Sequence, residues 1–166
     1  RDIAKKMGLP QEDCDLIYQA GILHDIRKIT TPDKILLKPG TLSDREYYLI
    51  KDHVSMSHKL LSKIPMYSKM ADIIYCHHER YNGTGYPRGL QGDEIPLLSH
   101  IMIIADAFDA MTSDRPYRKA LSKEEALRKM TRMSGIQFRP DLVAIFLKLM
   151  EKDRVQDAPL SVVRAA

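Results

Sequence analysis

The chain has 166 residues, a length that suits one domain with a sizeable core and leaves no room for a second full domain. Apolar residues make up 44% of the sequence and charged residues 29%, which excludes a disordered chain and a collagen-like repeat. The 26 lysines and arginines exceed the 22 aspartates and glutamates, and the net charge of +4 suits a polyanionic ligand without requiring one.

Helical periodicity dominates the sequence and strand alternation is scarce, so we predict an all-α fold. Apolar spacing, prolines and the two capping boxes Ser43–Glu46 and Ser122–Glu125 predict six helices, at about 11–26, 43–63, 66–80, 97–111, 122–133 and 140–149. The helix at 97–111 is apolar almost all round apart from Asp106 and Asp109, and we therefore expect it at the centre of the fold. The tail 152–166 is expected to fray.

Two segments connect the predicted helices. The first, 30–40, contains Pro32, Pro39 and Gly40 and is typical of a linker. The second, 82–96, holds four of the eight glycines and two of the nine prolines in the chain. This composition indicates a long and specialised loop.

Histidines give the main chemical signal. A lone histidine on an apolar face is more often a packed core residue than a metal ligand. Here, several of the six histidines lie beside another histidine or an aspartate near a predicted helix end. Four imidazoles and two carboxylates come from four different helices, as in the metal sites of helical bundles: His24, Asp25, His53, His77, His78 and Asp106.

Spacing and burial refine this prediction. Adjacent residues on a helix point about 100° apart, so the members of the pairs His24–Asp25 and His77–His78 are expected to address two neighbouring ions. Asp106 lies in an apolar helix, where an unpaired buried carboxylate is costly. A metal or a close hydrogen-bond partner must compensate it, and a helix cap or salt bridge is the alternative.

An ordered series of motifs resembles the HD-GYP domain, a branch of the HD metal-dependent phosphohydrolases. The motifs are HDIRK at 24–28, KPG at 38–40, His53, HHERYNGTGYP at 77–87, ADAFDA at 105–110, RPYR at 115–118 and QFRPD at 137–141. An isolated HD pair is weak evidence, whereas this series over most of the chain is specific. The resemblance implies an HD-domain helical bundle with a long GYP loop.

The resemblance also implies a bacterial phosphodiesterase that opens cyclic di-GMP to pGpG and then GMP by attack of a metal-bridging hydroxide. The metal ligands of the family fall on the six residues named above. Its substrate contacts fall on Lys28, Tyr86, Arg115 and Arg118. Family members are expected to contact diguanylate cyclase (GGDEF) domains through the GYP loop and to carry an upstream receiver or sensor domain, as in two-component systems.

Elementary chemistry agrees with this expectation. Two ions about 3.5–4 Å apart can orient a bridging hydroxide and stabilise the departing oxygen of a phosphodiester. Asp25 is the best candidate to bridge the ions, and the mixed imidazole and carboxylate set favours iron or manganese while leaving zinc and nickel open. Lys28, which follows His24 by one helical turn, would neutralise charge on the phosphoryl oxygens, as would Arg115 and Arg118.

Three residues depart from the usual family pattern: Arg27 replaces glycine, Asn82 replaces aspartate and His100 replaces arginine. The family also has an upstream histidine, preceded by a glutamate in members with three ions. Counting back from His24 places that histidine before residue 1. We therefore expect 1–166 to be one HD-GYP domain whose first helix and upstream ligand precede the sequence, and the choice between two and three ions stays open.

Other functions remain open at this point. The domain could hydrolyse another cyclic dinucleotide, or it could be a degenerate sensor or GGDEF scaffold, which Arg27 and Asn82 favour. A general HD nucleotidase agrees less well with the intact GYP loop, and the cations form no stripe that would fit a nucleic acid polymer. His58 and His100 are expected to be surface or packing residues.

The sequence also bears on location. No stretch approaches the roughly 18 consecutive apolar residues of a membrane span, and no signal-peptide core precedes the first helix. Cys14 and Cys76 are too few for a disulfide scaffold and lack CxxC spacing. We therefore expect reduced thiols and a cytoplasmic protein.

Overall fold

The computed structural model describes residues 1–26, 32–38, 40–114 and 118–156. The helices in chain order are α1 (Asp2–Lys6), α2 (Gln11–Leu23), α3 (Asp33–Leu36), α4 (Asp44–Leu61), η2 (Pro65–Tyr67), α5 (Ser68–Tyr75), η3 (Gly92–Glu94), α6 (Leu97–Thr112), α7 (Lys123–Arg132) and α8 (Pro140–Gln156). Within these ranges the chain has isolated β-bridges but no strand. The predicted all-α fold is confirmed. None of the described helices is long and apolar enough to cross a membrane.

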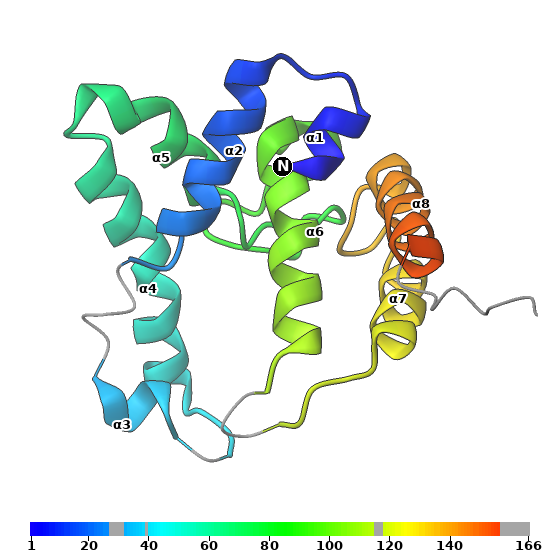
Figure 1. The fold of residues 1–166 in the computed structure, drawn as a ribbon. Helices are drawn as coiled ribbons and strands as arrows, with labels where there is room; N and C mark the ends of the chain where they lie inside the picture. The colour runs from blue at the N-terminus through cyan, green and yellow to red at the C-terminus, as the bar shows by residue number, and fades with distance from the viewer. Residues whose placement is uncertain (27–31, 39, 115–117, 157–166) are drawn as a thin grey trace, which may run out of the picture.

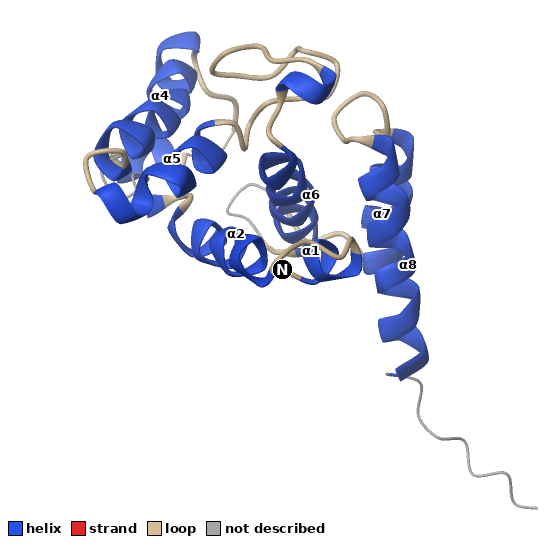
Figure 2. Ribbon diagram, turned by 90° about the horizontal axis from the view of Figure 1, so that it is seen from above, coloured by secondary structure: helices blue, strands red, loops and turns tan. Residues whose placement is uncertain are grey.

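Helix α6 is the centre of the bundle, as predicted. It packs against α1, α2, α5, α7 and α8. Helices α4 and α5 lie on one side of α6, and α7 and α8 lie on the other (Figures 1 and 2). The first two turns of α6 are buried almost continuously from Ser99 to Ile104. Further along α6, Asp106, Ala107, Ala110 and Met111 line a pocket.

Both predicted capping boxes are present. The hydroxyl of Ser43 accepts the backbone N–H of Glu46, and the carboxylate of Glu46 accepts the backbone N–H of Ser43 at 2.8 Å. Ser122 and Glu125 make the same pair of bonds at the start of α7. Each box satisfies two backbone donors that a helix start leaves without partners, and this explains why α4 and α7 begin where the sequence predicts.

Several helix ends differ from the prediction. Helix α2 ends at Leu23 instead of residue 26, and α5 ends at Tyr75 instead of residue 80. After α5 the backbone tightens, because His77 and Glu79 donate to carbonyls only three residues earlier. Helix α8 continues to Gln156, so residues 152–156 are helical where fraying was expected, and 157–166 lie outside the described residues. The segment 30–40, predicted to be a linker, contains the short helix α3.

Candidate metal centre

Six side chains with potential ligand atoms meet beside the middle of α6. They come from the turn after α2, from α4, from the turn after α5 and from α6 itself: His24, Asp25, His53, His77, His78 and Asp106. The ligand atoms form two overlapping groups, and within each group all atoms lie within 4.8 Å of one another: His53, His77 and His78 in one, His24, Asp25 and His77 in the other. The Oδ1 atom of Asp106 lies 3.5 Å from Nε2 of His24 and so adjoins the second group.

Backbone carbonyls orient three of the imidazoles. In each case Nδ1 bonds to the carbonyl three residues earlier: His24 to Gly21 at 2.8 Å, His77 to Ile74 at 2.5 Å, and His53 to Ile50. A carbonyl oxygen can only accept, so Nδ1 must carry the proton. In the neutral ring Nε2 is then the basic nitrogen, and a backbone bond at Nδ1 is how proteins commonly orient a histidine to bind a metal.

The electrostatics of the cluster call for a cation. Nε2 of His24 lies 3.4 Å from Asp25 and 3.5 Å from Asp106, so its lone pair would face two carboxylates if the ring were neutral. Burial alone would lower the pKa of His24, but the hydrogen bond to Asp106 and the charge of Asp25 outweigh burial and raise that pKa. Burial opposes the ionisation of Asp106 in turn, yet His24 lowers its pKa. A proton or a metal ion would relieve the same repulsion.

His77 is the member shared by both groups, and its environment fits a metal. The residue is 2% exposed, and burial lowers its pKa to about 4, so the ring is neutral at pH 7. Its Nε2 atom has no hydrogen-bond partner among the described residues, although an unsatisfied buried acceptor is costly. A divalent ion held by imidazoles and carboxylates would satisfy it.

The helix-spacing argument started from a wrong premise, whereas its conclusion, that each pair addresses two neighbouring ions, stays a prediction. Both members of the pair His24–Asp25 belong to one group of ligand atoms, and so do both members of the pair His77–His78. Neither pair lies within a helix, because α2 ends at Leu23 and α5 ends at Tyr75. The 100° separation of adjacent helical residues therefore does not apply to them.

The GYP loop is built around a buried carboxylate. Glu79 is 1% exposed and accepts the backbone N–H groups of Arg88 at 2.7 Å and Leu90 at 3.1 Å. A Cβ atom at Gly85 would lie 2.3 Å from the backbone nitrogen of Arg80, so only glycine fits there. The sequence motif contained Glu79, but its role in shaping the loop was not predicted.

The loop brings Tyr86 onto the cluster. Its ring stacks on His78 with centroids 4.8 Å apart, and its backbone N–H donates to the carbonyl of His78 at 3.2 Å. The ammonium of Lys51 lies 4.8 Å from the Tyr86 ring and 4.4 Å from the ring of Tyr47, which are cation–π distances. Burial raises the pKa of Tyr86, so its phenol stays protonated. Sequence reasoning missed Lys51 and Tyr47, whose i, i+4 spacing on α4 was the available signal.

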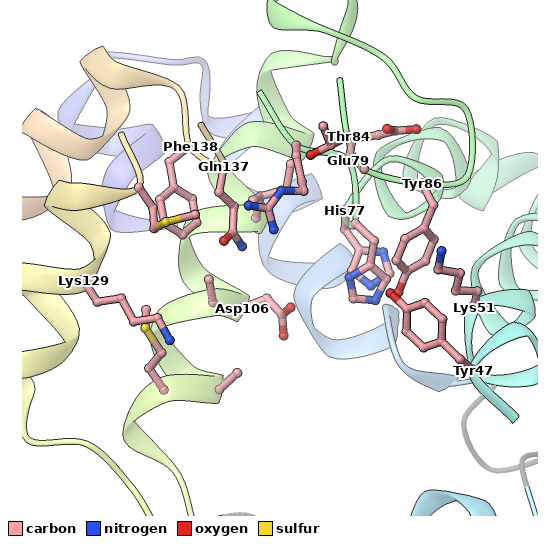
Figure 3. A pocket seen from close by; sticks show the side chains of 18 residues that line it. Tyr47, Lys51, His77, Glu79, Thr84, Tyr86, Asp106, Lys129, Gln137 and Phe138 are labelled. Atoms are coloured by element: carbon pink, nitrogen blue, oxygen red, sulfur yellow. The ribbon is translucent and has the colours of Figure 1, made fainter. Parts of the chain in front are cut away.

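A pocket of about 400 Å³ opens beside these residues (Figure 3). His77, His78, Asp106 and Tyr86 line it, and α6 contributes part of the lining. Arg118 is not among the described residues that line this pocket. Its guanidinium instead donates to the carbonyl of Ala110.

Other predicted residues fall elsewhere. Lys28, Arg27 and Arg115 lie outside the described residues. His100 is buried and bonds to the carbonyl of Gly92 at 3.0 Å, and His58 lies 3.1 Å from Asp72, so both have the packing or surface role that was expected.

Comparison with known proteins places this chain in a family. Residues 1–142 match the HD domain model, and the chain belongs to the HD domain family. The chain is 44% identical over 149 residues to a cyclic di-GMP phosphodiesterase of Thermotoga maritima, covering 89% of this chain and 40% of the relative. It is also 44% identical over 128 residues to 3'3'-cGAMP-specific phosphodiesterase 1 of Vibrio cholerae, covering 77% of this chain and 30% of the relative. The chain thus spans well under half the length of these relatives.

Solved structures agree on the fold. The crystal structure of the V. cholerae phosphodiesterase V-cGAP3 superposes with a TM-score of 0.72 at 22% identity, over 93% of this chain and 42% of that one. Bd1817 of Bdellovibrio bacteriovorus, described as an HDG"Y"P protein, superposes with a TM-score of 0.71 at 21% identity, over 90% of this chain and 48% of that one. The expected resemblance to the HD-GYP branch is confirmed.

Proposed function

We propose that this chain hydrolyses cyclic di-GMP to linear pGpG and then to GMP with two or three bound divalent metal ions. The observation that carries the proposal is the pair of overlapping ligand groups that share the buried His77, which lines a pocket of about 400 Å³. Relatives named as phosphodiesterases of cyclic di-GMP and of 3'3'-cGAMP support the substrate class.

The residues divide the work as follows. Bound metal ions would supply Lewis acidity and an activated water for attack on phosphorus. Asp25 is suited to bridge two ions, because its Oδ2 lies 3.4 Å from Nε2 of His24 while its Oδ1 lies 3.7 Å from Nε2 of His53. Four imidazoles with two carboxylates favour iron or manganese. Tyr86, which stacks on His78, would donate a hydrogen bond to the substrate or stack on it from the same side of the pocket.

Further parts of the proposal extend to residues and partners beyond the cluster. Lys28, Arg115 and Arg118 remain proposed phosphate contacts, although Arg118 would have to leave the carbonyl of Ala110 to reach a phosphate. The GYP loop is the proposed contact for GGDEF-domain proteins, and a receiver or sensor domain is the proposed upstream neighbour. A pull-down with wild-type protein and a variant with the loop 83–89 shortened tests the first of these partners.

The proposal is tested by anaerobic reconstitution of the purified protein with Fe(II) or Mn(II), followed by incubation with cyclic di-GMP and chromatography of the products. We expect pGpG and GMP with at least one metal. The double variant His24→Ala, Asp25→Ala should abolish turnover, whereas His58→Ala, a histidine outside the cluster, should retain it.

Two outcomes would contradict the proposal. Full turnover by the double variant would exclude the cluster as the catalytic site. Tight binding of cyclic di-GMP without product, at confirmed metal occupancy, would instead identify a sensor or scaffold.

A further inference from the structure

The pocket has a second part, away from the histidines, that the proposed chemistry does not use. Its wall is apolar and consists of Met111 on α6 with Met133 and Phe138 beyond the end of α7. Two polar side chains, Lys129 and Gln137, stand at its edge and reach toward the cavity from the side opposite Tyr86 (Figure 3). An apolar surface with a few polar groups at its edge is typical of small-molecule sites and suits a purine base.

Helix α6 joins this part of the pocket to the metal centre. Asp106, Ala107, Ala110 and Met111 all line the pocket, within little more than one helical turn. The two alanines carry only a methyl group, so they leave space between the carboxylate of Asp106 and the apolar wall. A ligand whose phosphate sits at the histidines can therefore place an attached base on that wall.

The backbone holds the edge residues in place. The N–H of Gln137 donates to the carbonyl of Met133 at 2.9 Å, and its own carbonyl accepts the N–H of Tyr81 at 3.2 Å. Asn82 donates in the same way to Ile136 at 3.0 Å. These bonds tie the turn after α7 to the GYP loop, so the apolar wall and the metal centre form one connected structure.

Lys129 forms no ion pair within the described part of the chain. No carboxylate lies within 4.0 Å of its ammonium there, whereas Lys38 is paired with Glu46 and Arg139 with Asp93 and Asp141. Glu79 also lines the pocket, but two backbone N–H groups already engage its carboxylate. The positive charge at this edge is therefore available to a ligand.

We propose that the wall of Met111, Met133 and Phe138 is a purine-base subsite, and that Lys129 makes it prefer guanine to adenine. The inference rests on the proposed function, because it assumes that the ligand is a cyclic dinucleotide. Guanine presents two acceptors, O6 and N7, on one edge, whereas adenine presents N7 beside an N6 amino donor. An ammonium can only donate, so it matches guanine and meets a like donor in adenine. The amide of Gln137 can donate or accept and serves either base.

The first test is calorimetric binding of cyclic di-GMP and cyclic di-AMP to the metal-loaded protein. We expect the wild-type protein to bind cyclic di-GMP more tightly than cyclic di-AMP. Lys129→Met should weaken the affinity for cyclic di-GMP about tenfold and change the affinity for cyclic di-AMP little. Lys129 is exposed, so the substitution should not disturb folding, and Lys123→Met on the same helix serves as the matched control. An unchanged affinity for cyclic di-GMP, an equal loss for both ligands, or no binding of either would overturn the subsite.

The second test uses 3'3'-cGAMP, which has one guanine and one adenine. A guanine-preferring subsite orients this ligand, so one of the two phosphodiesters should be cleaved in preference and one linear product, pApG or pGpA, should predominate. Lys129→Met should yield both products. Equal products from wild type would contradict the proposal. Guanine-selective binding without any hydrolysis would support the subsite and refute the proposed function. Hydrolysis with unselective binding would support the proposed function and refute the subsite.

Discussion

The Nε2 atom of His24 lies 3.5 Å from Oδ1 of Asp106, and this contact joins the turn after α2 to the middle of the central helix α6. Because Nδ1 of His24 is committed to the carbonyl of Gly21, the facing nitrogen must hold either a proton or a metal ion. The contact therefore makes metal loading, protonation and the packing of two helices interdependent.

Removal of His77 should reduce the amount of bound metal more than removal of a histidine that belongs to only one of the two ligand groups. His77→Ala deletes a ligand atom from both groups, whereas His53→Ala deletes one from a single group. We expect the first variant to lose most of its bound metal and the second to lose part of it, as measured by elemental analysis after reconstitution with Mn(II). Equal metal content in the two variants, with helicity retained by circular dichroism, would argue against a shared ligand.

Gly85→Ala should distort the GYP loop. The added Cβ would lie 2.3 Å from the nitrogen of Arg80 and 2.4 Å from Cα of Glu79, both backbone atoms that cannot move independently. We expect a loss of about 1–3 kcal/mol in the free energy of unfolding, measured with urea. Gly21→Ala is the control, because its Cβ would meet nothing within 4 Å on helix α2 and should leave stability unchanged or raise it by about 0.5–1 kcal/mol. Equal effects of the two substitutions would show that the loop tolerates a side chain.

Glu79→Gln should weaken the same loop without changing its volume. The carboxylate uses one oxygen for the N–H of Arg88 and the other for the N–H of Leu90. An amide has only one oxygen, and its NH₂ group would face a second donor, so one buried N–H loses its partner at a cost of about 1–3 kcal/mol. Hydrogen exchange should report the loss as faster exchange at Arg88 or Leu90. Unchanged protection of both amides would contradict this role.

The stability of the metal-free protein should be greatest near the ordinary pKa of histidine, about 6.5. Burial lowers the pKa of His77 to about 4, so between pH 6.5 and 4 this histidine is protonated in the unfolded chain but neutral in the folded one. The free energy of unfolding therefore falls as the pH drops from about 6.5 to 4. His24 has a raised pKa, so its contribution is complete below pH 6.5 and is lost as the pH rises through the raised value.

Urea titrations across this pH range measure both slopes. His77→Ala should flatten the acid side, and His58→Ala should not. A stability that keeps rising with pH well above 7 in the metal-free protein would contradict the His24 contribution.

The sequence by itself determined the helical class, the central place of α6 and the identity of the clustered residues. Apolar periodicity and capping chemistry act over a few residues, so the serines that start α4 and α7 could be read directly. The prediction failed at the ends of α2 and α5, where the last residues form turns instead of helix.

Only the tertiary structure decided how the side chains of the centre converge. The pairing of His24 with Asp106, the shared position of His77 and the contact of Lys51 with Tyr86 each depend on how helices distant in the sequence pack against each other. Such packing is set by burial summed over the whole core, which no local pattern contains. The same packing brings the turn after α7 to the pocket, and it alone placed Lys129 across from the histidines.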